Sequence, residues 1–182
     1  MILTLYMAIT SRMAGGGFYA NRLWKPLPEL LFSIPFGWCG AEIARHFTDS
    51  NPVQIVAYIT AFVWSYLWMQ TGHGTVLPWG GKLQESDRGR TQFLTPAVTR
   101  LAKLLRIEVF QDDNHSRTLN YCRLFMAVKG FLIALPVGGV VLAVLWPLAY
   151  EIGTRMRNHA LSELIAGAGA GVAISLFIIL MG

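Results

Sequence analysis

The chain has 182 residues, of which 54% are hydrophobic and 14% are charged, and its formal net charge is +5. Soluble domains carry roughly 25% charged residues, so the apolar side chains of this chain exceed what one soluble core could bury. We attribute the positive charge to orientation in a membrane and not to nucleic-acid binding, because Lys and Arg collect on the cytoplasmic side of membrane proteins. The two cysteines, Cys39 and Cys122, have neither metal-site nor disulfide spacing.

The amino-terminal residues 1–9 are apolar but too short to cross a bilayer. Gly15, Gly16 and Gly17 then interrupt the run. We expect an interfacial or half-inserted helix here, and the alternative is a fifth span that extends through Tyr19. Because Arg12 follows the apolar run, the order of charge and apolar residues is wrong for a cleavable signal peptide.

Four longer apolar segments follow, at residues 27–44, 52–69, 128–150 and 161–181. Each approaches the roughly 20 residues that a helix needs to cross the hydrocarbon. Helices are expected because a bilayer offers no hydrogen-bond partner to unpaired backbone amides. The sequence therefore predicts an all-α fold, a polytopic transmembrane helical bundle with about four spans, in which residues 1–182 form a single membrane domain.

A polar region at about residues 70–124 separates the second and third spans. It begins with a stretch rich in glycine and charge, and residues 95–107 then have the pattern of a short amphipathic helix. Its apolar residues recur at helical spacing: Val98, Leu101, Leu104 and Leu105. Three basic residues lie elsewhere on the helix, Arg100, Lys103 and Arg106, which predicts binding to anionic headgroups at the membrane surface.

The distribution of Lys and Arg predicts the orientation. With four spans, Arg45, Arg155 and Arg157 lie on one side of the membrane, and most of the other basic residues lie on the opposite side. This bias places both termini and the middle loop in the cytoplasm.

The last two segments contain small or helix-breaking residues. The third is interrupted by two prolines and a glycine pair: Pro136, Gly138, Gly139 and Pro147. We expect one kinked helix, in which the kink is either a packing feature or a hinge. In the fourth, Gly167 and Gly171 form a small-xxx-small pair that favours close helix contact, either within the chain or between two copies.

Ionisable residues inside membrane segments are costly and are candidates for function. Glu42 precedes His46 by four residues, and His159 precedes Glu163 by four, so each pair shares a helical face. In the predicted topology both pairs lie at the non-cytoplasmic face, where they could bind a metal ion or relay protons. The alternative is two local helix pairs at the membrane interface.

A second group of candidates lies in the middle region. His73 stands between two glycines that leave room for a ligand. Asp112, Asp113 and His115 form a polar cluster before the third span. With His73, they could form a metal or acid–base site, and the alternative is a set of polar turn residues. No cofactor follows from the sequence.

Three motifs together resemble small polytopic membrane proteins encoded by tailed phages and prophages: TGHGTVLPWG at residues 71–80, PLAYEIG at 147–153 and SELIAGAGAGVAI at 162–174. The resemblance implies a bacterial inner-membrane location, for example in an infected host, and carries over no catalytic residue.

We therefore expect a protein that acts through helix association in the membrane. Its partners would be the lipid bilayer and either a second copy or a host membrane protein, with no role for nucleic acid. Two alternatives stay open. One is a small membrane enzyme that acts on a lipid or lipid-linked substrate through His73, His115, Asp112 and Asp113, and the other is an ion-coupled transporter module.

Overall fold

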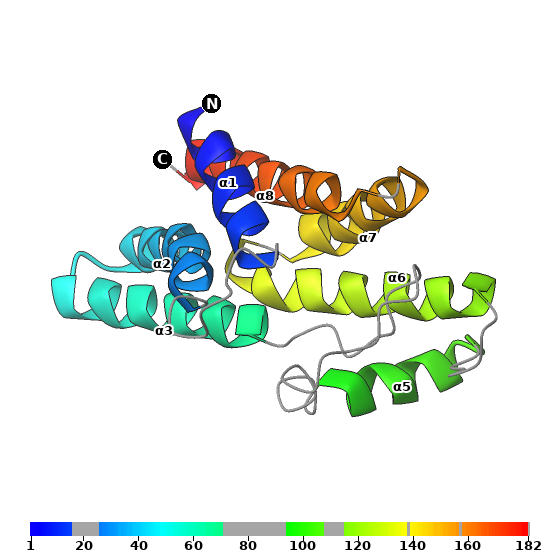
Figure 1. Cartoon of the computed structure of the whole chain (residues 1–182). Coiled ribbons are helices and arrows are strands. Elements are labelled where there is room, and N and C mark those ends of the chain that lie inside the picture. The colour runs from blue at the N-terminus through cyan, green and yellow to red at the C-terminus, as the bar shows by residue number, and fades with distance from the viewer. Residues whose placement is uncertain (16–25, 71–93, 108–114, 138, 157, 182) are drawn as a thin grey trace.

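The computed structural model describes residues 1–15, 26–70, 94–107, 115–137, 139–156 and 158–181. Within these ranges the regular structure is entirely helical, as the sequence predicts (Figure 1). The elements are α1 (Ile2–Gly15), α2 (Pro26–Phe47), α3 (Asn51–Gln70), α5 (Leu94–Leu104), α6 (His115–Ile133), the short 3-10 helix η1 (Leu135–Val137), α7 (Val140–Arg155) and α8 (His159–Met181).

The segments at 27–44 and 52–69 form α2 and α3, which pair as an antiparallel hairpin. The turn between them is held by the Gln54 side chain, which donates to the carbonyl oxygen of Thr48 at 3.0 Å. The two helices approach very closely at Gly40. A Cβ atom there would lie 2.6 Å from Ala61 Cβ and 2.7 Å from the Ala57 carbonyl oxygen. Small residues thus allow backbone-to-backbone packing along this hairpin.

The prediction of one kinked helix across residues 128–150 is wrong. Helix α6 ends at Ile133, η1 follows, and α7 begins at Val140. Gly139 adopts a φ of +63°, a left-handed conformation that costs glycine little. Its N–H donates to the Ala134 carbonyl oxygen at 2.8 Å, which closes the turn.

After this turn the chain runs back along α6. Gly130 of α6 lies against Leu142 and Trp146 of α7, and Arg123 forms an ion pair with Glu151. The partners of residues early in α6 are therefore late in α7, so α6 and α7 form an antiparallel hairpin. We call this element the α6–α7 hairpin.

Helix α8 corresponds to the fourth predicted segment and lies between α1 and α7. It packs antiparallel on α7, where Gly169 faces Leu145, and on α1, where Gly167 faces Met7 and Ser11. The main core lies between these helices and α2. Its fully buried large side chains include Met7, Phe32, Phe36, Ile133, Leu142 and Ile174.

The predicted amphipathic helix is present as α5, but its buried face differs from the prediction. Val98 and Ala102 pack against Phe125 of α6, whereas Leu104 and Leu105 are 81% and 56% exposed. Six residues rotate a helical side chain by about 600°, which leaves Leu104 about 120° away from Val98. Ala102, four residues after Val98 and about 40° from it around the helix, lies in the buried face instead.

Candidate functional site

An ion pair closes the contact between α1 and α8. Arg12 Nη1 lies 3.3 Å from Glu163 Oε2, and the Glu163 side chain is only 10% exposed. The start of α8 is capped by Asn158, whose Oδ1 accepts a hydrogen bond from the Leu161 N–H at 3.2 Å. One turn beyond Glu163, Gly167 brings the backbones of the two helices together. The Arg12–Glu163 ion pair and Gly167 therefore both lie in the contact between α1 and α8.

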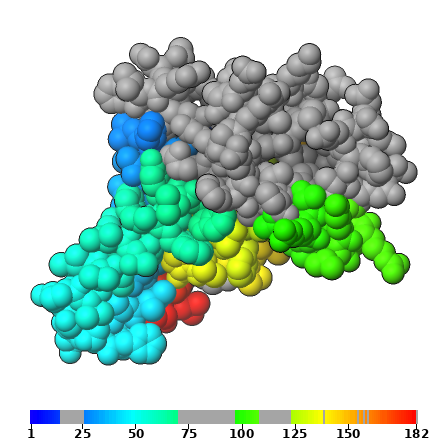
Figure 2. Space-filling view, turned by 90° about the horizontal axis from the view of Figure 1, so that it is seen from below, coloured from blue at the N-terminus to red at the C-terminus, as the bar shows by residue number. Residues whose placement is uncertain are grey.

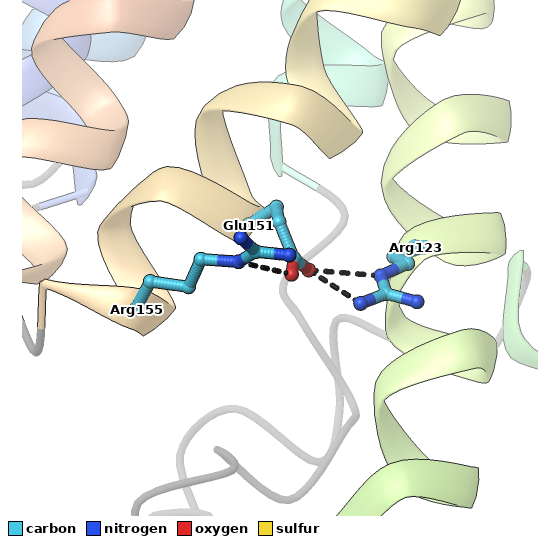
Figure 3. A network of polar contacts seen from close by, with 3 residues as sticks. All are labelled: Arg123, Glu151 and Arg155. Carbon is cyan, nitrogen blue, oxygen red and sulfur yellow. Dashed lines mark hydrogen bonds and ion pairs between the residues drawn. The ribbon is translucent and has the colours of Figure 1, made fainter.

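A second charged cluster lies at the open end of the α6–α7 hairpin (Figure 3). Glu151 Oε2 accepts hydrogen bonds from Arg123 Nη2 at 2.6 Å and Nε at 2.9 Å. Glu151 Oε1 accepts a third from Arg155 Nε at 2.9 Å. The hydrogen bonds from Arg123 and then Arg155 hold the pKa of Glu151 below its ordinary value of 4.5.

This cluster predicts a loss of stability in acid. Because the folded pKa of Glu151 is lowered, its contribution is complete above pH 4.5 and disappears as the pH falls through the folded pKa. We expect Glu151→Gln to lower the free energy of unfolding by about 1 kcal/mol at pH 7, since both arginines are partly exposed. Thermal unfolding in detergent between pH 7 and pH 3 should then be less pH-dependent than for the wild type. Asp49→Asn, which changes an exposed acid of the α2–α3 turn, should keep the wild-type profile.

The closed end of the α6–α7 hairpin is tied to α3 by two side-chain hydrogen bonds. Pro136 has no N–H to donate to the carbonyl oxygen of Leu132, four residues earlier. Trp64 Nε1 donates to that oxygen at 2.8 Å, and Ser65 Oγ donates to the next one, that of Ile133, at 2.8 Å. Two carbonyl groups released by the end of α6 are thus satisfied from α3.

A buried lysine of α6 forms a further contact with α3. Lys129 is 4% exposed, and its Nζ donates to the Met69 carbonyl oxygen in the last turn of α3 at 3.4 Å. A cation at a helix carboxyl terminus is favourable because the unpaired carbonyl groups there carry partial negative charge. The contact therefore fixes the end of α3 on α6.

The predicted Glu/His sites do not come together. Glu42 accepts a hydrogen bond from Trp38 Nε1 at 2.8 Å and pairs with Arg45 at 3.0 Å, both on its own helix. Glu163 of α8 pairs instead with Arg12 of α1, at 3.3 Å. The expectation that both pairs lie at one membrane face stays a prediction.

No group of three His, Cys, Asp or Glu side chains suited to a metal ion occurs in the described part of the chain. His46 packs edge-on against Phe47, with ring centroids 5.6 Å apart. His159 is the first residue of α8, and its side chain lies outside the description.

The proposed catalytic group stays a prediction. His73, Asp112 and Asp113 lie outside the described residues. His115 begins α6, and the description covers its backbone alone.

The sequence interpretation missed the partners of these groups. Arg12 and Glu163 are 151 residues apart in the chain, and no local pattern connects them. For Arg123 and Glu151 there was a signal: Pro136 and the following glycines, if interpreted as a reversal, would have placed the two charges at the same end.

No family model, curated protein or solved structure matches the chain. Its function therefore has to be inferred from its own surfaces and contacts.

Proposed function

We propose that the chain is an integral helical protein of the bacterial inner membrane. Among the described residues, two helices could cross a bilayer by length and composition: α3 over Asn51–Met69 and α8 over Ala160–Met181. A core helix of a soluble protein passes the same test, but most of its residues are buried. Here 17% of the α3 window and 33% of the α8 window are buried, and this difference carries the proposal.

The exposed side of α3 supports lipid as its surroundings. Figure 2 looks onto this side of the molecule, where α3 forms an open surface along its length. The exposed large apolar residues of this helix extend from its first to its last turn: Val53, Ile55, Val56, Ile59, Val63, Trp64 and Leu67. A continuous apolar surface of this kind on one helix is typical of contact with lipid or another membrane helix.

Charged residues lie at the two ends of these helices. Helix α3 and residues 164–181 of α8 contain no Asp, Glu, Lys, Arg or His. Arg45, His46 and Asp49 lie at the α2–α3 turn, which we call the turn rim. The opposite end holds the hairpin rim: Arg12, Arg123, Glu151, Arg155 and Glu163. Residues 164–181 would extend about 27 Å as a helix, close to the roughly 30 Å of hydrocarbon in a bilayer.

We infer that the protein acts by packing against another membrane protein, either a second copy or a host protein. Arg12 with Glu163, and Arg123 with Glu151, pair within the chain. The helices therefore present apolar side chains to their surroundings, which suits contact with lipid and with other helices. The described residues add no observation that favours the lipid-directed enzyme or the ion-coupled module.

Membrane extraction of a tagged chain and its variants tests the proposal. The wild type should stay with the membranes in alkaline carbonate and be released by detergent. Ile59→Asp places a charge near the middle of α3, where it costs about 3 kcal/mol for insertion, so the carbonate-resistant fraction should fall about tenfold or more.

Two control variants separate charge from packing. Ile59→Ala removes the same side chain without adding a charge, and Asn51→Asp adds the charge at the end of α3. Both should remain in the membrane fraction. Recovery of the folded wild type in the soluble fraction would overturn the proposal.

A further inference from the structure

We propose that the α6–α7 hairpin is inserted in one leaflet of the bilayer, and that it enters and leaves from the hairpin rim. The inference rests on the proposed membrane location and adds a specific lipid-contacting surface and an orientation. It is carried by the polarity of the hairpin, its length and the hydrogen bonds at its tip.

The exposed side chains of the hairpin change along its length from charged to apolar, and Lys129 between the two ends is buried against the Met69 carbonyl oxygen of α3. Its open end carries Arg123, Glu151 and Arg155, which form the hydrogen-bonded cluster of Figure 3. Toward its closed end, the exposed side chains are large and apolar: Phe131, Leu135, Val140, Val141, Val144 and Leu148. The open end therefore suits water and headgroups, and the closed end suits hydrocarbon.

The length of the hairpin fits half of a bilayer. Ile133, the last residue of α6, lies ten positions after Arg123. At 1.5 Å per residue this distance is about 15 Å, half of the roughly 30 Å of hydrocarbon. With its charged end at the membrane surface, the tip would lie near the midplane.

Hydrogen bonds at the tip also fit a location in hydrocarbon. A turn inside hydrocarbon is tolerated where its backbone polar groups are paired within the protein. The carbonyl oxygens of Leu132 and Ile133 accept hydrogen bonds from Trp64 and Ser65 of α3. The next one, that of Ala134, accepts from the N–H groups of Val137 and Gly139 at 2.8 Å each. Without these internal donors, the three oxygens would be unpaired in hydrocarbon.

This insertion changes the orientation expected from four crossings. If the hairpin returns to its own side, α8 starts at the hairpin rim and its carboxyl end lies on the side of the turn rim. Of the Lys and Arg residues in the described ranges, Arg45 alone then lies at the turn rim. The positive-inside rule therefore puts the hairpin rim and α5 in the cytoplasm and the end of α8 outside.

Labelling of single cysteines with a membrane-impermeant maleimide tests the insertion in the full-length protein. Cys122→Ser and Cys39→Ala provide the background. Three exposed positions report on which side of the membrane each part lies: Asp49→Cys at the turn rim, Met156→Cys after α7 and Lys103→Cys on α5. Leu135→Cys reports on the tip of the hairpin.

We expect Asp49→Cys to react in intact cells, and Met156→Cys and Lys103→Cys to react only in inverted membrane vesicles. Leu135→Cys should react in neither preparation until detergent is added. Reaction of Met156→Cys from the same side as Asp49→Cys would overturn the inference, because the chain would then cross the membrane once between the start of α6 and the end of α7. Reaction of Leu135→Cys without detergent would also overturn it. Recovery of the protein in the soluble fraction would instead reject the membrane location itself.

Discussion

Gly167→Ala is expected to lower the free energy of unfolding by about 1–3 kcal/mol, the usual cost of adding a methyl group to a closely packed contact. The added Cβ would lie 2.4 Å from the Met7 carbonyl oxygen and 2.6 Å from Ser11 Cβ. Since the nearest atom belongs to the backbone of α1, the clash is relieved only if the helices separate. Thermal unfolding in detergent measures the effect.

Gly169→Ala is the matched control on the same helix. Its Cβ would lie 2.8 Å from Leu145 Cδ1, the end of a flexible side chain that can rotate away. A loss of stability as large as that of Gly167→Ala would contradict the prediction. If Gly167 instead serves self-association, its replacement should change the size of the detergent-solubilised particle and leave the unfolding temperature of the monomer unchanged.

Glu163→Gln should lower the free energy of unfolding by about 2–3 kcal/mol. Removing one partner of a buried ion pair costs about 3–5 kcal/mol, and the 33% exposure of the Arg12 side chain reduces this penalty. The change leaves the arginine next to a neutral amide at the contact of α1 with α8. Thermal unfolding of Glu163→Gln, Arg12→Met and the double variant measures the coupling between the two residues.

The double variant should be less destabilised than the sum of the two single variants. Additive losses would show that the ion pair contributes nothing of its own. Glu42→Gln is the comparison at the other end of the molecule, where Arg45 is 59% exposed. Its effect should stay below about 1 kcal/mol, because a solvent-exposed pair is screened by water.

Much of the secondary structure followed from local pattern. The apolar segments at 27–44, 52–69 and 161–181 correspond to α2, α3 and α8. The turn signal at Pro136 and Gly139 marked the position of a break correctly. Its consequence was misjudged, because proline and glycine show where a helix ends and not where the chain goes afterwards.

The candidate site was less predictable than the helices. Glu163 was identified as a costly ionisable residue, but its interaction with Arg12 was not. The i, i+4 spacing suggested His159 as its neighbour, since spacing along a helix is the one proximity that sequence reveals directly. Trp64 and Ser65 looked like ordinary members of an apolar run, although both satisfy carbonyl groups of α6.

The sequence by itself determined that the chain is helical and apolar beyond the needs of one soluble core, and where most helices begin and end. These properties depend on composition and on neighbours within a few residues. The tertiary structure decided that residues 128–150 reverse. The reversal depends on donors from α3 for the carbonyl groups that α6 leaves unpaired, and Ser65 lies 68 residues from Ile133. A contact between residues so distant exists only after the helices have packed.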